Sequence, residues 1–342
     1  WAATIILLTQ PEALFGASFQ ISFAATISTV AFYERYGHLV HSSQAGWFDK
    51  FRLYFLGLML TSLVATCATT PFVIYHFSRF TMWGIVANML IIPLVSFWIM
   101  PAAVLAFIAM PFGLEHWPLI WLNHGIGLMI DGAKWLATLP YASFSITPLT
   151  TWGWLLSIYG GLWLCLWAKK WHLLGIPAIL VGLTTIALHK PYDVLISDDG
   201  TKVAARMENG EFVFLRGRAD SFDGESWLRA HGKEKGFTPK EVEHVECDKL
   251  LCQLELAGKA IAVATSNKNP DAICRTNADI IITAAFTEKN CNANALIIDR
   301  AFLEHNGATA LRFSSDNTII ETATEARGKR PWVIFPKEIN AE

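Results

Sequence analysis

Residues 69–111 read TTPFVIYHFSRFTMWGIVANMLIIPLVSFWIMPAAVLAFIAMP. The stretch is too long and too apolar for a helix of a water-soluble protein, so it predicts membrane-spanning structure. Prolines recur in it every few turns, at Pro71, Pro93, Pro101 and Pro111. Each proline removes a backbone donor and frees carbonyls that lipid cannot satisfy. Either the prolines belong to broken helices that line a transport path, or they kink ordinary packed membrane helices, in which proline is frequent.

The composition changes near residue 190. The whole chain is 53% hydrophobic, with 14 Trp and 22 Phe in 342 residues, but most of its charges follow residue 190. We therefore expect a polytopic α-helical membrane domain over residues 1–190 and a soluble α/β domain over residues 191–342. Trp1 is not a natural start residue and residues 1–8 look like the end of an apolar helix, so we expect the chain to lack its own N-terminal region.

The apolar segments predict a membrane topology. A short apolar helix is expected at Ser18–Phe32, and the candidate spans are Leu53–Tyr75, Met82–Met110, Trp117–Leu139, Thr151–Ala168 and Leu173–Leu188. Two connections carry the basic residues: the first holds Arg35, Lys50 and Arg52, and the second is Lys169–Lys170. The positive-inside rule assigns both to the cytoplasm. Counting the spans between and after them predicts that the C-terminal half lies in the periplasm.

A polar stripe crosses the third candidate span. His124, Gly127, Asp131 and Lys134 fall at near-helical spacing on one face. Ionisable groups at membrane depth usually face a bundle interior or a water-filled path. Alternatively, the segment is an amphipathic helix at the membrane surface, in which Asp131 and Lys134 form a solvated pair. Arg79, in a short outward connection, is either an interfacial charge or a phosphate contact at a channel mouth.

Two short motifs carry a family resemblance. Thr70-Pro71, followed by Asn88 and Ile92-Pro93, resembles the core of the competence family of ComEC-type DNA-uptake channels. Ser18–Phe23, which reads SFQISF, is similar to a second signature of that family, and the two occur in the expected order.

The resemblance implies a channel that passes single-stranded DNA across the inner membrane during natural transformation. Its partners would be the DNA strand, the lipid bilayer and other competence proteins on both membrane faces, and no cofactor is implied. Together with the polar stripe, it gives as transport-path candidates Gln20, Arg79, Asn88, Pro93, His124, Asp131 and Lys134. A small-solute secondary transporter with an accessory periplasmic domain would use broken helices and a His/Asp/Lys face equally well. A membrane-anchored hydrolase is a third possibility, but the sequence has no nucleophile elbow, phosphate loop or zinc motif.

The soluble half alternates short strand-like runs with helix-like pieces, which is typical of a layered α and β domain. Strands are expected at Asp193–Ser197, Lys202–Met207, Phe212–Arg216, Cys252–Thr265, Asp279–Ala284, Ala295–Ile298 and Ala310–Phe313. Asp199-Gly200 and Asn209-Gly210 are turn signals. Helices are expected after Ser221, at Asp271–Thr276 and at Arg300–His305.

Many relatives of ComEC carry a metallo-β-lactamase-like domain at this position, and Tyr192–Leu195 resembles the start of its first strand. The zinc chemistry of that domain needs a His-x-His-x-Asp-His cluster. Here His231, His244 and His305 are isolated in the sequence. The sequence thus predicts a divergent domain that binds no metal and is not an enzyme.

Four cysteines of the soluble half, Cys247, Cys252, Cys274 and Cys291, allow three pairings. A periplasmic location predicts disulfides, most simply Cys247–Cys252 and Cys274–Cys291, whereas a cytoplasmic one predicts thiols. A zinc site is less favoured because no Cys-x-x-Cys pair is present. Two further cysteines, at positions 67 and 165, lie in apolar spans and are expected to be buried thiols.

Overall fold

The computed structural model describes residues 1–39, 46–242, 245–265, 273–287, 295–314 and 317–328. The chain divides into two compact units, Trp1–His189 and Lys190–Glu342. The division falls one residue before the expected domain boundary. The units are described separately below.

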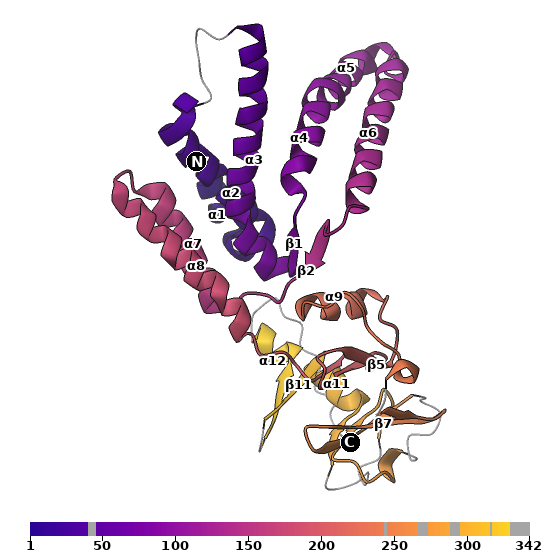
Figure 1. Ribbon diagram of the computed structural model, residues 1–342. Helices are drawn as coiled ribbons and strands as arrows, with labels where there is room; N and C mark the ends of the chain where they lie inside the picture. The colour runs from indigo at the N-terminus through magenta and orange to yellow at the C-terminus, as the bar shows by residue number, and fades with distance from the viewer. Residues whose placement is uncertain (40–45, 243–244, 266–272, 288–294, 315–316, 329–342) are drawn as a thin grey trace. The chain divides into compact units, whose positions relative to one another are not determined.

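The first unit begins with α1 (Ala2–Thr9), the short 3-10 helix η1 (Pro11–Phe15), α2 (Ala17–Tyr36) and η2 (Gly37–Leu39). After six residues outside the described range comes α3 (Trp47–Phe77), which packs along α2 (Figure 1). The Tyr33 hydroxyl of α2 lies 2.6 Å from Thr61 Oγ1 of α3. Because α3 begins at Trp47, Lys50 and Arg52 of the first basic connection lie in the first two turns of a helix rather than in a loop.

The prolines do not break the helices. Pro71 lies inside α3, and Pro93 lies inside α4 (Gly84–Leu94). A π-helical turn, η3 (Val95–Ile99), follows and leads into α5 (Met100–Ala109) and η4 (Met110–Phe112). In η3 the Met100 N–H donates to the carbonyl of Val95, five residues earlier. Such a turn shifts the backbone hydrogen bonds by one residue, from the fourth to the fifth preceding carbonyl, after a proline has removed a donor. The prolines therefore lie in continuous helical segments rather than in unwound ones.

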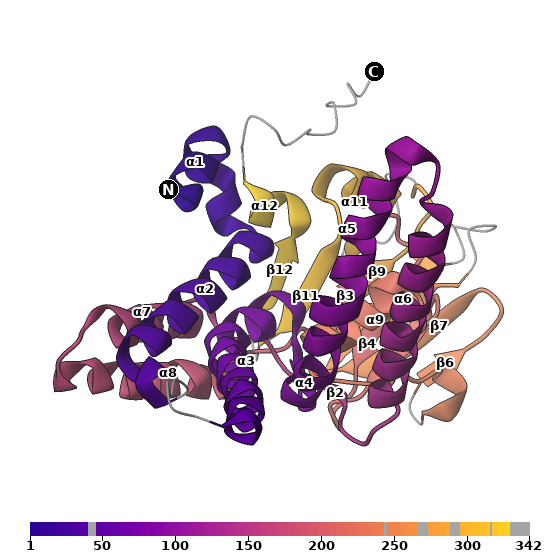
Figure 2. The same cartoon turned by 90° about the horizontal axis from the view of Figure 1, so that it is seen from above.

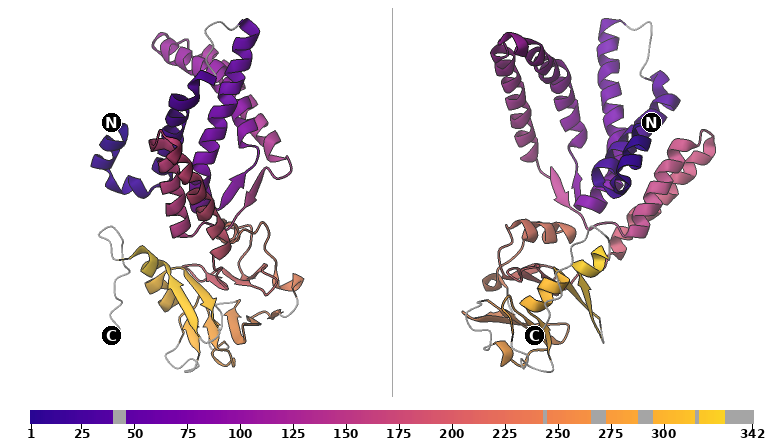
Figure 3. Two further views of the ribbon diagram at one scale, coloured as in Figure 1. Left: turned by 60° about the vertical axis from the view of Figure 1, so that its left-hand side comes forward. Right: turned by 180° about the vertical axis from the view of Figure 1, so that it is seen from behind.

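The connections before α4 and after α6 (His116–Ala137) meet in a two-stranded ribbon. β1 (Arg79–Thr81) pairs antiparallel with β2 (Ser143–Ser145). The rings of Phe80 and Phe144 lie 5.5 Å apart, and the Trp83 indole donates to the Pro140 carbonyl over 3.0 Å. Both ends of the α4–α6 hairpin therefore lie at the C-terminal end of α3, as Figure 3 shows.

The unit ends with a second helical hairpin, seen side by side in Figure 2. It consists of α7 (Thr151–Leu166), η5 (Lys170–Leu174), α8 (Gly175–Thr184) and η6 (Thr185–Leu188). Its backbones approach so closely that a Cβ on Gly160 would lie 2.7 Å from the Gly175 carbonyl oxygen. Glycines at such contacts are typical of membrane helix pairs.

Three helical segments of the described part are long and apolar enough to cross a membrane: Trp47–Phe77, Gly84–Phe112 and Lys170–Leu188. They correspond to the first, second and fifth expected spans. α7 is apolar but shorter. α6 is long enough, but the polar residues of its stripe lower its hydropathy.

The described residues of the second unit form two five-stranded sheets. The first is antiparallel, in the order β12-β11-β3-β4-β5, and the second has the order β10-β9-β8-β7-β6, with β10, β9 and β8 parallel. The strands of the first sheet are β3 (Val194–Ile196), β4 (Val203–Arg206), β5 (Phe212–Arg216), β11 (Thr309–Phe313) and β12 (Thr318–Thr322). Those of the second are β6 (Val245–Cys247), β7 (Leu251–Leu256), β8 (Lys259–Ala264), β9 (Ile280–Ile282) and β10 (Leu296–Ile298).

The main core of this unit draws side chains from both sheets, among them Val194 and Ile196 of β3 and Ile261 of β8. Leu195, between the two β3 residues, belongs instead to a cluster with Leu228 of α9 (Phe222–Ala230). Alternate residues of a strand point to opposite faces, so β3 is buried on both faces, which explains its uninterrupted apolar sequence. The remaining short elements are η7 (Pro239–Glu241), α11 (Arg300–Asn306) and α12 (Ala323–Arg327).

One strand prediction is wrong. The run Cys252–Thr265 is not one strand but the β7–β8 hairpin. The turn lies at Ala257-Gly258, whose φ angles are 51° and 74°. A two-residue hairpin turn of type I′ has positive φ at both central residues, and Asn-Gly or Asp-Gly is its usual signal. An alanine at the first position hides this turn from the sequence. β6 and β12 were also not expected.

Candidate functional site

Gln20, in the SFQISF motif, connects α2 to the C-terminal end of α3. Its amide nitrogen donates to the Leu14 carbonyl over 2.8 Å, so its Oε1 is free to accept. His76 Nε2 lies 2.7 Å from that oxygen and is therefore the donor. This hydrogen bond links residues 56 positions apart in the sequence. His76 lies in α3, the helix that also contains Thr70-Pro71. We call the contact the Gln20–His76 junction.

Aromatic side chains of α3 and α7 surround the junction. Tyr75 stacks on Trp154 with ring centroids 4.5 Å apart, and Phe72 meets the same indole edge-on at 6.2 Å. His76 lies 6.1 Å from Trp154, also edge-on. Side chains of α2, α3 and α7 thus meet near this polar contact.

The polar stripe of α6 lines an open hollow of about 700 Å³. Three indoles, an amide, an imidazole and a carboxylate contribute to its wall: Trp98, Trp117, Trp121, Asn123, His124 and Asp131. We call it the indole hollow. Within α6, His124 Nδ1 donates to the Ile120 carbonyl over 2.8 Å, which leaves Nε2 available as an acceptor when the ring is neutral.

The π-helical turn brings Trp98 to this hollow. Its indole N–H donates to the Trp121 carbonyl over 3.0 Å, and its ring covers Gly125, where an added Cβ would lie 2.8 Å from Trp98 Cδ1. Only a residue without a side chain leaves room for the indole. Gly125 of α6 and the turn after Pro93 together fix the position of Trp98.

The structure brings some of the transport-path candidates together and separates others. His124, Gly127 and Asp131 line the indole hollow, whereas Lys134 is not among its lining residues. None of the ion pairs found in the described residues includes Asp131 or Lys134. No direct ion pair therefore links the two side chains, and the choice between a path-lining helix and an amphipathic surface helix stays a prediction.

The other candidates lie on different elements. Arg79 is exposed on β1, where it pairs with Ser145, and Asn88 is half-buried on α4. Pro93 lies two residues before the π-helical turn. Sequence reasoning missed His76 and Trp98. A glutamine in an apolar helix needs a polar partner. That need is the signal that could have found His76, which lies in the last turn of α3.

Arg35 joins the two basic connections. Its Nη2 donates to the Trp167 carbonyl over 2.7 Å, so it caps the C-terminal end of α7 beside Lys169 and Lys170. The first and second basic connections consequently lie at the same end of the first unit.

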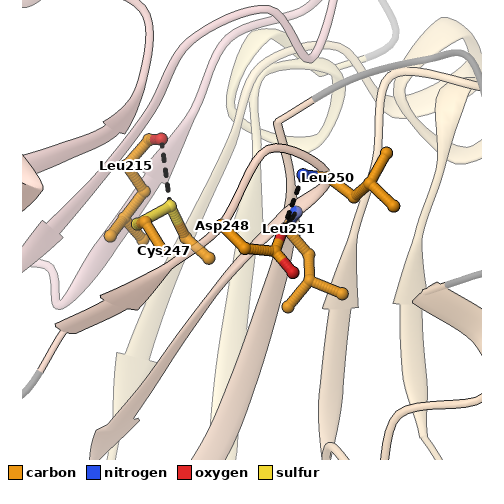
Figure 4. The surroundings of a disulfide bond; sticks show 6 residues. Leu215, Cys247, Asp248, Leu250 and Leu251 are labelled. Carbon is orange, nitrogen blue, oxygen red and sulfur yellow. Dashed lines mark hydrogen bonds between the residues drawn. A yellow bond between two sulfur atoms is a disulfide. The ribbon is translucent and has the colours of Figure 1, made fainter.

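Cys247 and Cys252 form a disulfide across the β6–β7 hairpin (Figure 4). Cys252 is buried and its sulfur lies 3.7 Å from the Leu215 carbonyl oxygen. Between the two cysteines, the Asp248 carboxylate accepts from the backbone N–H groups of Leu250 and Leu251, which lower the pKa of Asp248. This pairing is the one taken as simplest from the sequence.

The other cysteines are placed as follows. Cys274 is also disulfide-bonded, while its expected partner Cys291 lies outside the described residues. Cys67 and Cys165 are free. Cys67 is exposed rather than buried, and Cys165 is half-buried.

The two described histidines of the second unit, His231 and His305, are not grouped. His231 Nδ1 donates to the Trp227 carbonyl over 2.7 Å and its Nε2 accepts from the Tyr192 N–H over 3.3 Å. His305 is exposed at the end of α11, and His244 lies outside the described residues. In the part of the chain that the structure describes, no three His, Cys, Asp or Glu side chains are arranged to hold a metal ion.

Comparison with known proteins gives a family match and a match to one curated relative. Residues 1–171 match the family model described as Competence protein. A stretch of 100 residues, 29% of this chain, is 34% identical to ComE operon protein 3 of Bacillus subtilis (strain 168). The match covers 11% of that relative, so the chain spans only a small part of the length of the curated protein it resembles. No solved structure matches the chain.

Proposed function

This chain belongs to the Competence protein family, and we propose that it forms part of a channel for single-stranded DNA in the inner membrane. Family membership supports a role in competence. The Gln20–His76 junction is the observation that carries the proposal. It links Gln20 of the SFQISF motif to His76 of α3, the helix that also contains Thr70-Pro71 of the other motif, so parts of both motifs belong to one helix pair. Arg79, Asn88, Pro93, His124, Asp131 and Lys134 remain candidates for the wall of the path.

The proposed orientation has a cytoplasmic end with both basic connections and a periplasmic second unit. Two contacts support it. Arg35 binds the end of α7, so the basic connections share one side. β1 pairs with β2, so the connections that precede α4 and follow α6 share one side too. An alternating path of α3, α4–α5, α6, α7 and α8 satisfies both constraints and ends on the side opposite to Arg35.

For the second unit we propose a periplasmic accessory role. The Cys247–Cys252 disulfide supports an oxidising compartment. A divergent metallo-β-lactamase-like domain without metal or hydrolase activity is the proposed identity of residues 191–342, and other competence proteins are the proposed partners.

A small-solute transporter remains the second candidate, because the indole hollow holds a carboxylate and an imidazole on one helix face. Either role requires a polar path through the bilayer. Only the DNA channel requires the chain for uptake of free DNA.

Deletion of the gene, followed by transformation with free DNA, tests the proposal. Transformation should be lost, should return with the wild-type chain and should not return with Gln20→Leu. Gln10→Leu is the matched control because Gln10 is exposed at the end of α1. Undiminished transformation of the deletion strain would reject the DNA channel and leave the solute transporter.

A further inference from the structure

The indole hollow contains the wrong charge for a phosphate chain. Asp131 is its charged residue, and neither Lys nor Arg is among its described lining residues. A carboxylate repels phosphodiesters, and phosphate-binding surfaces are built from lysine and arginine. If a DNA strand passes along α6, its phosphates therefore avoid this surface.

The same wall suits nucleobases. Trp117 is 74% exposed and Trp121 is 49% exposed, so both indoles offer free ring surface. They are four residues apart on α6 and consequently lie on one face of the helix. Proteins that bind single strands without sequence preference stack successive bases on such aromatic side chains.

Trp98 adds a third ring that the structure holds in place. Its centroid lies 6.0 Å from that of Trp121, and its hydrogen bond to the Trp121 carbonyl together with Gly125 fixes its orientation. A side chain held by neighbours loses little conformational freedom on binding. The volume of about 700 Å³ is in the usual range for small-molecule sites.

Polar groups at the margin match base edges. The Asn123 amide both donates and accepts hydrogen bonds, and a neutral His124 offers its Nε2 lone pair. Asp131 accepts hydrogen bonds from exocyclic amino groups and from ring N–H groups of bases. Every base has a flat face and some donor or acceptor on its edge, so this set tolerates any sequence.

We infer that the indole hollow binds the bases of single-stranded DNA by stacking, with the phosphates turned away from Asp131. This inference rests on the proposed function and specifies which part of the strand contacts this site. Trp98, Trp117 and Trp121 are the stacking residues, and Asp131 keeps the phosphates outside.

Binding to the purified full-length chain tests it. Affinities are measured by fluorescence anisotropy for a labelled deoxyadenosine homopolymer and for an abasic phosphodiester of equal length. Both carry the same charge, so their ratio of affinities isolates the contribution of the bases. We expect the base-containing strand to bind more tightly and Trp121→Ala to reduce this ratio about tenfold. Trp152→Ala is the control, because Trp152 is 82% exposed on α7 and does not line the hollow.

Other occupants predict other results. If phosphates entered the hollow, Asp131→Asn would strengthen binding of both strands alike and Trp121→Ala would leave the ratio unchanged. If a second copy of the chain covered the hollow, Trp121→Ala would change the molecular mass in solution and leave the ratio unchanged. Either outcome overturns the inference. If transformation still depends on the chain, the proposed function survives that failure; if transformation does not depend on the chain, both fail.

Discussion

His76 Nε2 donates a hydrogen bond to Gln20 Oε1 over 2.7 Å, between two helices of the first unit. The His76 ring lies 5.1 Å from the Tyr75 ring and 6.1 Å from the Trp154 ring, and both Gln20 and His76 are half-buried. A hydrogen-bond donor or acceptor that is shielded from water loses more free energy when its partner is removed than the formed hydrogen bond contributes to stability. The junction is therefore expected to act as one unit in folding and in function.

Replacing either member of the junction should expose this coupling. Gln20→Leu leaves the His76 N–H without its acceptor and should lower the free energy of unfolding by about 1–3 kcal/mol. His76→Leu should do the same for Gln20. The double variant should cost less than the sum, with a coupling of at least about 0.5 kcal/mol. Thermal unfolding of the detergent-solubilised chain measures these values, and strict additivity would show that the two side chains act independently.

The disulfide prediction concerns the number of reactive thiols. Thiol labelling of denatured, unreduced protein should modify Cys67 and Cys165 and leave Cys247, Cys252 and Cys274 unmodified. The expected pair Cys274–Cys291 would protect the sixth cysteine as well. The short loop closed by Cys247–Cys252 predicts a stabilisation of about 2 kcal/mol in the loop-entropy model. Modification of all six cysteines would contradict both the pairing and the oxidising compartment.

The orientation prediction places the C-terminus in the periplasm. A reporter fused after Glu342 that is active only in the periplasm should be active, and a reporter that is active only in the cytoplasm should be silent. The physical reason is the retention of Arg35, Lys169 and Lys170 on the cytoplasmic side. The reverse pattern would remove the basis of the periplasmic assignment.

The elements predicted from the sequence are those set by hydropathy or by a turn signal. α3 and α4–α5 follow from long apolar runs, and β3, β4 and β5 follow from apolar runs separated by Asp199-Gly200 and Asn209-Gly210. The β7–β8 turn could not be predicted, because Ala257 takes a positive φ that its residue type disfavours.

The indole hollow and the Gln20–His76 junction were likewise predictable from the sequence only in part. The α6 stripe was visible at helical spacing, and three of its four residues line the indole hollow. Trp98 was not predictable, because its position depends on a π-helical turn and on a glycine 27 residues further along the chain, at Gly125. His76 lies outside any motif, and only the tertiary packing of α2 on α3 brings it to Gln20.

The glycines of the α7–α8 hairpin offer a matched pair of substitutions. A Cβ at Gly160 would lie 2.7 Å from the Gly175 carbonyl oxygen, whereas nothing lies within 4 Å of one at Gly161. Gly160→Leu should therefore force the helices apart and cost about 1–3 kcal/mol or more. Gly161→Leu should cost much less. Thermal unfolding and the yield of folded protein compare the two, and equal effects would contradict the close backbone contact.

The pH dependence of the second unit should include a contribution from Asp199. Its Oδ1 accepts from the Ser197 hydroxyl at 2.6 Å and from the Thr201 N–H at 2.9 Å, and its Oδ2 accepts from the Thr201 hydroxyl at 2.7 Å. Partial burial raises the pKa of Asp199, but the hydrogen bonds from Ser197 and Thr201, aided by the Lys202 charge, lower it from 3.8 to about 2.

Because the pKa of Asp199 is lower in the folded state, its stabilising contribution is fully present above pH 3.8 and is lost as the pH falls towards 2. The side chain is exposed to solvent, so the expected contribution is reduced to about 1 kcal/mol. Asp199→Asn removes the charge and keeps the shape. Thermal unfolding of residues 190–342 should therefore show the variant less stable at neutral pH, with the difference shrinking between pH 4 and 2. A difference that stays constant over this range would mean that the ionised carboxylate does not stabilise the turn between β3 and β4.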